Sequence, residues 1–111
     1  PSPVTLGYTS FLRATVRSEE PCVGAAAVLP CYWLYSEIGL RMADHIRADH
    51  PYRAWLETYS DEGFITQTKA AMARVERALA AGSPRGRARA VRAFLNSCHW
   101  EREFFDQASR A

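Results

Sequence analysis

The sequence of 111 residues has few cysteines, and they do not form a recognisable framework. The three, Cys22, Cys31 and Cys98, are odd in number, contain no CxxC pair and do not cluster with histidines at zinc-ligand spacing. These absences exclude a disulfide-stapled fold and a zinc site. We expect three free thiols in a reducing compartment, and neither a metal nor an organic cofactor. A lone thiol is most often a small buried hydrophobe.

The sequence also lacks an excess of charge of one sign and a long unbroken apolar run. Lys and Arg number 14 against 12 Asp and Glu, which leaves a net charge of +2 and argues against a nucleic-acid partner. The longest apolar stretch, Cys22–Leu40, is interrupted by Gly24, Pro30, Ser36, Glu37 and Gly39. A bilayer requires about 20 mostly apolar residues, so we expect no membrane span. With no signal-like segment at the start, the sequence indicates a cytoplasmic protein.

Helical periodicity is the pattern that the sequence does have, and no strand alternation accompanies it. Apolar residues make up 48% and charged residues 23%, as in ordinary globular domains, and the length suits one domain. The periodicity predicts an all-α fold of antiparallel helices joined by short loops, as in a bundle. Helices are expected over residues 5–16 and 23–48, followed by a short helix with Pro51 at its first position. The next helix has Ser60 as its N-cap and reaches Ala81, with Gly82 at the C′ position. The last helix covers residues 85–109 and follows the cap Ser83 and Pro84.

Glu101 interrupts the apolar stripe expected on the last helix. That stripe consists of Val91, Phe94, Cys98, Phe105 and Ala108, and its gap of seven residues contains the glutamate. A carboxylate inside a core is costly unless it is paired or hydrogen-bonded, and burial raises the pKa of a carboxylic acid toward neutrality. Such a group suits general acid catalysis. Alternatively, Glu101 lies at the edge of the stripe and reaches solvent or an arginine.

The Pro30-Cys31 step interrupts the second expected helix. Proline removes a backbone hydrogen bond and clashes with the carbonyl four residues earlier, here that of Ala26, so a kink is expected. Tyr35 follows one turn later and shares a face with Cys31. A thiol at a kink beside a phenol is a plausible nucleophile. The structural alternative is a proline kink, a buried cysteine and a core tyrosine.

Tyrosines are unusually frequent on the faces expected to be buried. Buried hydroxyls need partners, and several converging on one cavity would form a polar, aromatic pocket for a flat heteroaromatic ligand. Ordinary packing with hydroxyls at the rim is the alternative for each of them. These tyrosines are Tyr8, Tyr35, Tyr52 and Tyr59.

The histidines and the basic run offer little chemistry. We expect no catalytic role for the three histidines. His45 lies on the polar face of its helix, His50 lies in a turn, and His99 lies beside the apolar stripe of the last helix. The arginines are expected on a solvated face rather than at a phosphate site; they are Arg85, Arg87, Arg89 and Arg92.

Four motifs in the same order resemble the TenA family, the thiaminase II enzymes. The most specific is the eleven-residue stretch Leu29-Pro30-Cys31-Tyr32-Trp33-Leu34-Tyr35-Ser36-Glu37-Ile38-Gly39. The other three are Tyr8-Thr9-Ser10-Phe11-Leu12, Tyr52-x-x-Trp55-x-x-x-Tyr59 and Ser97-x-x-x-Glu101-x-x-Phe104-Phe105-Asp106. Together they span almost the whole sequence.

The resemblance implies a haem-oxygenase-like helical fold, of which this chain corresponds to about the C-terminal half, and a homotetramer. Residues 1–111 would then form a single TenA-like domain that lacks its N-terminal helices. The family's first half also supplies an aspartate that binds the aminopyrimidine. Neither Asp44 nor Asp49 is expected to replace it.

The resemblance also implies an activity, namely hydrolysis of aminopyrimidines. The family releases hydroxymethylpyrimidine from thiamin and from 4-amino-5-aminomethyl-2-methylpyrimidine. Carried over by position, Cys31 is the nucleophile, Glu101 the acid/base group and Tyr35 a hydrogen-bond partner near the thiol, whereas Tyr8 and Tyr59 contact the pyrimidine. In this hypothesis, Glu101 protonates the ring or the leaving amine, the Cys31 thiolate adds to the ring, and water replaces the group on the methylene.

Two other functions remain compatible with the sequence. One is a haem- or quinone-dependent enzyme on the same scaffold, although none of the three histidines lies on an expected core stripe. The other is a non-catalytic, pyrimidine-binding or regulatory helical protein. The preferred substrate, the ring carbon attacked and the group that activates the thiol are not evident from the sequence.

Overall fold

Every regular element in the part of the chain that the structure describes is helical, which confirms the expected all-α class. The computed structural model describes residues 1–42, 45 and 47–110. The elements are α1 (Pro3–Ser18), α2 (Pro21–Val28), α3 (Pro30–Met42), α4 (Arg53–Ser60), α5 (Glu62–Ala81), α6 (Pro84–Asp106) and a terminal 3₁₀ turn, η1 (Gln107–Arg110).

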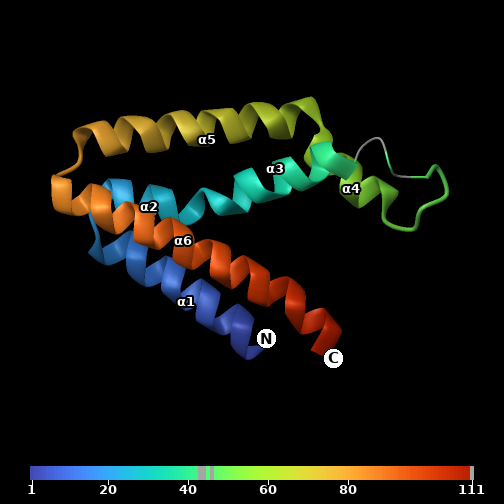
Figure 1. Ribbon diagram of the computed structural model, residues 1–111, viewed down its shortest axis with the longest axis horizontal. Helices are drawn as coiled ribbons and strands as arrows, with labels where there is room; N and C mark the ends of the chain where they lie inside the picture. Colours follow the sequence, from blue (N-terminus) through green and yellow to red (C-terminus); the bar gives the residue numbers. More distant parts are fainter. Residues whose placement is uncertain (43–44, 46, 111) are drawn as a thin grey trace.

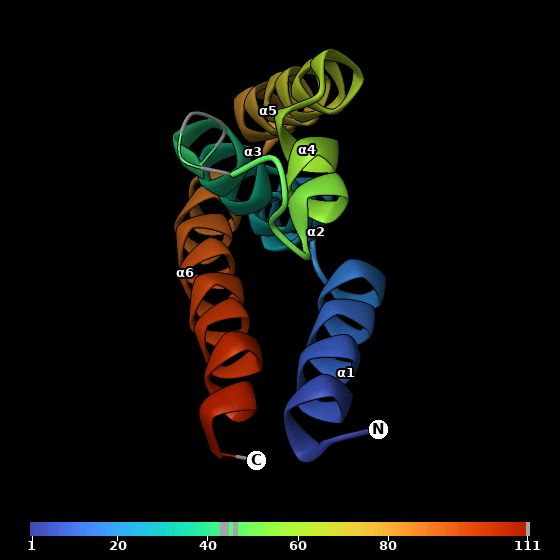
Figure 2. The same ribbon diagram turned by 90° about the vertical axis from the view of Figure 1, so that its right-hand side faces the viewer.

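The helices form an open and thin arrangement. Helices α1 and α6 run antiparallel with both chain ends at one end of the molecule, while α5 lies beyond α2 and α3 (Figure 1). The view turned by 90° shows α1 and α6 extending from one side of α2 and α3 and α5 lying on the other (Figure 2). The extents are 49 × 33 × 17 Å and the radius of gyration is 15.5 Å. A compact domain of this size has a radius of gyration of about 13 Å, so large areas of helix surface are uncovered.

The best-buried core lies between α2 and α6 and is built from small side chains. Ala27 is 0% exposed and Ala90 is 1% exposed, and Phe11, Leu12 and Phe94 pack around them. Because alanine adds little bulk, the two helix backbones approach closely and exclude water from their contact.

The stripe expected on the last helix was therefore wrong by one position. Val91 is 61% exposed and Phe105 is 45% exposed. The buried face of α6 consists instead of Gly86, Ala90, Ala93, Ser97 and Glu101. Side-chain size explains the difference, since the close approach of α2 selects small residues and leaves their larger neighbours at the margins.

The long second helix is broken at Pro30, as the kink prediction required. Leu29 keeps helical torsions of φ −54° and ψ −40°, but Pro30 has no N–H to donate to the Ala26 carbonyl. The helix also ends at Met42 rather than at 48, because the described residues beyond it form turns. Residues 43, 44 and 46 of that prediction lie outside the described residues.

The segment formed by α2 and α3 changes the basis of the sequence argument against a membrane span. Pro21–Met42 is long and apolar enough, by length and composition, to cross a bilayer, and the described residues contain no second such helix. However, 44% of its most apolar window is buried inside the protein, and α2 supplies the core. The α2 half of this segment is thus part of the core, whereas α3 keeps exposed apolar side chains such as Ile38 and Met42.

Two helix starts differ from the sequence prediction. The N-cap of α5 is Asp61, whose carboxylate accepts from Gly63 N at 3.0 Å, whereas Ser60 is the last residue of α4. Pro51 lies in a turn, and α4 begins only at Arg53. At the start of α5, the carboxylate of Asp61 therefore caps the backbone N–H groups that have no partner within the helix, in place of the Ser60 hydroxyl.

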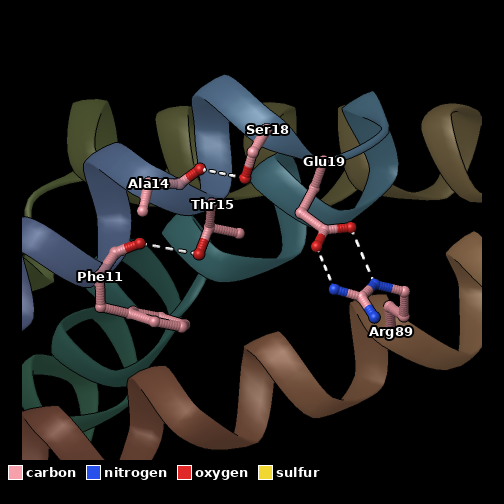
Figure 3. Close-up of polar contacts among 6 residues, drawn as sticks. All are labelled: Phe11, Ala14, Thr15, Ser18, Glu19 and Arg89. Atoms are coloured by element: carbon pink, nitrogen blue, oxygen red, sulfur yellow. Dashed lines mark hydrogen bonds and ion pairs between the residues drawn. The ribbon is translucent and has the colours of Figure 1, made fainter.

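The junction between α5 and α6 is tied to the junction between α1 and α2. Ser83 caps α6 as predicted, and the Glu20 carboxylate accepts from Ser83 N at 3.0 Å and from Ser83 Oγ at 2.5 Å. Gly82 ends α5 in an extended conformation, φ −81°, instead of the expected left-handed one. Next to it, Arg89 donates to both carboxylate oxygens of Glu19 (Figure 3). These contacts fix the end of α1 against α6.

Candidate functional site

Glu101 lies in the buried face of α6, where both of its carboxylate oxygens accept hydrogen bonds. It is 4% exposed. The Tyr8 hydroxyl of α1 donates to Oε1 at 2.7 Å, and the Tyr35 hydroxyl of α3 donates to Oε2 at 3.2 Å. Of the two interpretations of this residue, the structure therefore supports the core position and not the solvent-facing edge. The two phenols offset part of the free energy that burying a carboxylate costs.

Cys31 reaches the carboxylate through Tyr8. The Cys31 sulfur lies 3.2 Å from the Tyr8 hydroxyl oxygen. Tyr8 has a single O–H, which it donates to Glu101, so its oxygen is left to accept from the Cys31 thiol. The three groups form a chain in which the thiol donates to the phenol and the phenol donates to the carboxylate.

The surroundings of these groups raise their pKa values. Burial raises the pKa of the Cys31 thiol above its ordinary value; the Tyr8 hydroxyl opposes this shift because it can donate to the ionised sulfur, and the nearby Glu101 charge adds to it. Burial, followed by the hydrogen bonds with Cys31 and Glu101, raises the pKa of Tyr8 far above its usual range. Burial and the charge of Glu101 likewise raise the pKa of Tyr35. At neutral pH, the thiol and both phenols are protonated.

An aromatic wall continues from Tyr35 to α4. The rings of Tyr35 and Tyr59 lie 5.1 Å apart between centroids, and Phe105 lies 5.8 Å from Tyr35 on another side. Tyr59 also meets Trp55 at 4.9 Å and Phe64 at 5.1 Å, both edge-on. Thus Tyr59 joins the site through its ring, whereas the other predicted site residues meet through hydrogen bonds.

An apolar groove of about 570 Å³ adjoins this wall. Phe105 and Trp55 belong to both. Tyr52 lies here and is 68% exposed, so the expectation that it occupies a core face was wrong. Tyr52 is the N-cap residue in front of α4, and that helix itself buries only Leu56. The groove is lined by Ile38, Met42, His50, Tyr52, Trp55, Leu56 and Phe105.

The other two thiols differ in their surroundings. Cys22 is 1% exposed and packs in the core between α2 and α6. Cys98 is partly buried on α6, where burial and the charge of Glu101 raise its pKa. All three cysteines are free thiols, as expected.

The described histidines and Asp49 lie away from the Cys31–Tyr8–Glu101 hydrogen bonds. His45 and His99 are exposed, and His50 accepts from Tyr52 N at 3.1 Å in a turn. Asp49 is exposed and pairs with Arg47 at 3.8 Å, while Asp44 lies outside the described residues. The described residues contain no group of three or more His, Cys, Asp or Glu side chains that could hold a metal ion.

Sequence reasoning missed two features of the site. The group that links the thiol to the carboxylate is Tyr8, which the sequence placed only in the ligand pocket. The second is Ser97, 0% exposed, whose hydroxyl donates to the Ala27 carbonyl at 2.6 Å beside the Pro30 kink. Its spacing of four residues before Glu101 was the available signal, because it places both on one helix face.

Comparison with known proteins agrees with the family resemblance of the sequence. A model of the TENA/THI-4/PQQC family matches residues 1–111. The multifunctional thiamine biosynthesis protein ThiED of Corynebacterium efficiens is 54% identical over 110 residues, which are 99% of this chain and 15% of that protein. The aminopyrimidine aminohydrolase of Bacillus subtilis is 33% identical over 111 residues, 99% of this chain and 47% of the relative. That of Halalkalibacterium halodurans is 31% identical over 110 residues, 97% of this chain and 49% of the relative.

The chain thus spans about half the length of the two aminohydrolases and a small part of ThiED. The match of the family model extends over every motif that carried the sequence resemblance and over all four hydrogen-bonded site residues. The chain belongs to the TENA/THI-4/PQQC family.

Proposed function

We propose that this chain carries the nucleophile and the acid/base group of an aminopyrimidine hydrolase of thiamin metabolism. The products would be 4-amino-5-hydroxymethyl-2-methylpyrimidine with ammonia from the aminomethylpyrimidine, or the same pyrimidine with the thiazole from thiamin. The observation that carries the proposal is the buried Glu101 carboxylate joined to the Cys31 thiol through one hydroxyl, that of Tyr8.

The first step is activation of the thiol. The Cys31 proton moves to the Tyr8 oxygen while the Tyr8 proton moves to Oε1 of Glu101, which leaves a thiolate, an intact phenol and a neutral carboxylic acid. Both transfers follow hydrogen bonds that already exist, of 3.2 and 2.7 Å. A thiol with a raised pKa is thereby ionised through hydrogen bonds that lead to a proton acceptor. The Glu101 carboxylic acid then holds the proton that the leaving group takes in the next step.

The second step is substitution at the methylene of the substrate. With the aminomethylpyrimidine, the thiolate forms a carbon–sulfur bond with the pyrimidine ring, and the carbon–nitrogen bond breaks as the leaving amine takes the proton of Glu101. Water then adds to the methylene carbon and gives a proton to the Glu101 carboxylate. The carbon–sulfur bond breaks and returns its electron pair to sulfur. Glu101 serves as acid and then as base, which requires one carboxylate held near both atoms.

The aromatic wall supports binding of a flat heteroaromatic substrate. The Tyr35 ring, packed against that of Tyr59, belongs to a residue whose hydroxyl donates to Glu101, and Tyr8 supplies a second hydroxyl to the same carboxylate. Stacking and hydrogen bonding by these residues would orient a pyrimidine ring, as tyrosine combines an apolar face with a polar tip.

The proposal includes assembly as a cytoplasmic homotetramer with no nucleic-acid or membrane partner. It rests on the family resemblance and on exposed apolar side chains such as Val91 and Leu95, which offer surface for subunit contact. Light scattering on the purified full-length protein tests the assembly, and a monomer would contradict it.

The deciding experiment is ammonia release from 4-amino-5-aminomethyl-2-methylpyrimidine at neutral pH by the full-length protein. We expect turnover by the wild type and a loss of at least about a hundredfold in kcat for Cys31→Ala and for Glu101→Gln. The matched control is Cys98→Ala, a partly buried thiol one turn from Glu101, which keeps its activity. Circular dichroism verifies that each variant is folded.

The alternative functions appear as distinct outcomes. If the pyrimidine binds to the wild type and no ammonia forms, the protein is a pyrimidine-binding or regulatory member of the family. If the wild type turns over and Cys31→Ala is unaffected, Cys31 serves packing and the reaction depends on Glu101 without a covalent step. If a purified full-length protein shows a haem Soret band, the cofactor-dependent reading on this scaffold gains its first support.

A further inference from the structure

A second contact between α1 and α6 lies directly beside the Tyr8–Glu101 hydrogen bond. The Trp100 ring is stacked on the Tyr8 ring, with an interplanar angle of 8° and 6.4 Å between centroids. Trp100 also covers the α1 backbone at Gly7. A Cβ atom at Gly7 would lie 2.5 Å from Cη2 and 2.9 Å from Cζ3 of Trp100. The indole thus occupies space that only a glycine leaves open.

The two contacts are formed by consecutive residues on both helices. Gly7 precedes Tyr8 on α1, and Trp100 precedes Glu101 on α6. The indole therefore sets the distance between α1 and α6 at this point, and the side chains of Tyr8 and Glu101 must span that same distance. That pair meets at 2.7 Å between the hydroxyl and Oε1.

The Tyr8 hydroxyl has little freedom of position if it is to serve two partners. It lies 2.7 Å from Oε1 of Glu101 and 3.2 Å from the Cys31 sulfur, on two different helices. Hydrogen bonds weaken steeply with misalignment, and a misplacement of about 1 Å can cost about a hundredfold in rate. The phenol oxygen lies on the axis of the second side-chain torsion, so the first torsion, which packing against the ring restrains, fixes its place. Because the hydroxyl hydrogen prefers the plane of the ring, that plane fixes the directions in which the oxygen donates and accepts.

We infer that Trp100 is a positioning residue that holds the Tyr8 ring in the plane from which its hydroxyl bridges Cys31 and Glu101, with Gly7 as its required partner. The inference deepens the proposed function, on which it rests. Trp100 acts through the ring of Tyr8, on which it is stacked.

The test enlarges Gly7 and shortens Trp100, separately and together, in the full-length protein. Gly7→Ala displaces the indole, so kcat for ammonia release falls about tenfold while KM changes less than about twofold. Phenylalanine lacks the three atoms that a new Cβ would meet. In a Trp100→Phe background, Gly7→Ala therefore causes little further loss. An equal loss in both backgrounds would overturn the inference.

A background without the phenol hydroxyl shows whether the effect passes through Tyr8. In Tyr8→Phe, Gly7→Ala should lower kcat no further, whereas a general defect of α1 would lower it again. Gly63→Ala is the matched control, because a Cβ there meets only the end of the Asp61 side chain. Should Gly7→Ala fail to fold, Trp100→Leu replaces it, since it removes the ring plane; full kcat in that variant would contradict the inference.

A readout independent of turnover separates this inference from the proposed function. Alkylation of Cys31 by iodoacetamide, followed by peptide mass spectrometry across pH, reports its ionisation. After the proton relay the Tyr8 O–H donates to the Cys31 thiolate and stabilises it, so displacing Tyr8 moves the midpoint to higher pH in Gly7→Ala, and the Trp100→Phe double variant restores it. A protein without hydrolase activity that still shows this shift would refute the function and retain the positioning role. An unchanged midpoint would refute the positioning role.

Discussion

The two ends of the α2–α3 segment are packed in opposite ways. At the α2 end, Ala27 and Ala90 are almost fully buried in a contact between small residues. At the far end of α3, Ile38 is 38% exposed and Met42 is 39% exposed, beside an apolar groove. The α2 end consists of small, closely packed side chains, whereas the far end of α3 carries large, partly exposed side chains beside the groove.

The candidate site lies where these two regions meet. Glu101 is the last residue of the buried face of α6, and Phe105, one turn later, already lines the groove. Cys31 follows the kink at the end of the tightly packed region. The packed end thus fixes the reacting groups, and the open end supplies aromatic surface beside them. This division predicts that substitutions at the two ends act very differently.

The largest effect is expected from enlarging the small-residue contact. Ala90→Leu should lower the free energy of unfolding by about 3 kcal/mol, because a leucine at a site 1% exposed must push α2 away. At the open end, Tyr52→Ala should change it by less than about 0.5 kcal/mol, since Tyr52 is 68% exposed. Urea denaturation followed by circular dichroism measures both. Similar losses for the two variants would remove the distinction between the regions.

A somewhat smaller loss is expected where α4 crosses α3. A Cβ at Gly39 would lie 2.6 Å from the Tyr59 carbonyl carbon and 2.8 Å from its oxygen. Backbone cannot swing aside as a side chain can, so Gly39→Ala should cost about 2 kcal/mol, partly offset by the better helix propensity of alanine. It should also separate the Tyr59 and Tyr35 rings and raise KM for the pyrimidine. Gly63→Ala is the control; equal stability of the two variants would show that α4 moves freely.

Much of this fold was predictable because local signals agree with the tertiary structure. Helical periodicity, Pro30 and the Ser83-Pro84 start of α6 each predicted an element or a break that the structure contains. The errors arose where size or a rival side chain decided. The α6 stripe was misplaced because hydrophobicity favoured Val91 over Ala90, and Asp61 displaced Ser60 as the cap.

The candidate site was predictable in its residues but not in its connections. An acid in an apolar stripe and a thiol at a kink stand out on one helix each, so spacing singled out Glu101 and Cys31 as candidates, and the family resemblance supplied their proposed roles. The link through Tyr8 joins positions 23 and 93 residues apart in the sequence, and no local pattern encodes such a distance. Trp100 gave no signal for the same reason, since its partner Gly7 is on another helix.

A moderate effect is expected at the hydrogen bond that joins α6 to the kink. Ser97→Ala removes the 2.6 Å bond to the Ala27 carbonyl and should lower the free energy of unfolding by about 1 kcal/mol. The neighbour Asn96 is exposed, so Asn96→Ala should have almost no effect in the same denaturation experiment. If both substitutions are neutral, the kink is held by packing alone.

The smallest effect, and the most specific to the border between the two regions, is a loss of stability in alkali. The pKa values of Cys31, Tyr8 and Tyr35 are raised by folding, so the folded state keeps protons that the unfolded chain loses, first from thiols near pH 8.5 and then from phenols near pH 10. Unfolding therefore becomes more favourable as pH rises through this window, and below it the contribution is complete. Tm measured between pH 7 and 10.5 should fall, and Tyr8→Phe should flatten the upper part of the curve by about a few degrees, because it removes a phenol that ionises only after unfolding. Identical curves for the two proteins would mean that solvent reaches Tyr8 before unfolding, and that the open end of the molecule extends as far as the carboxylate.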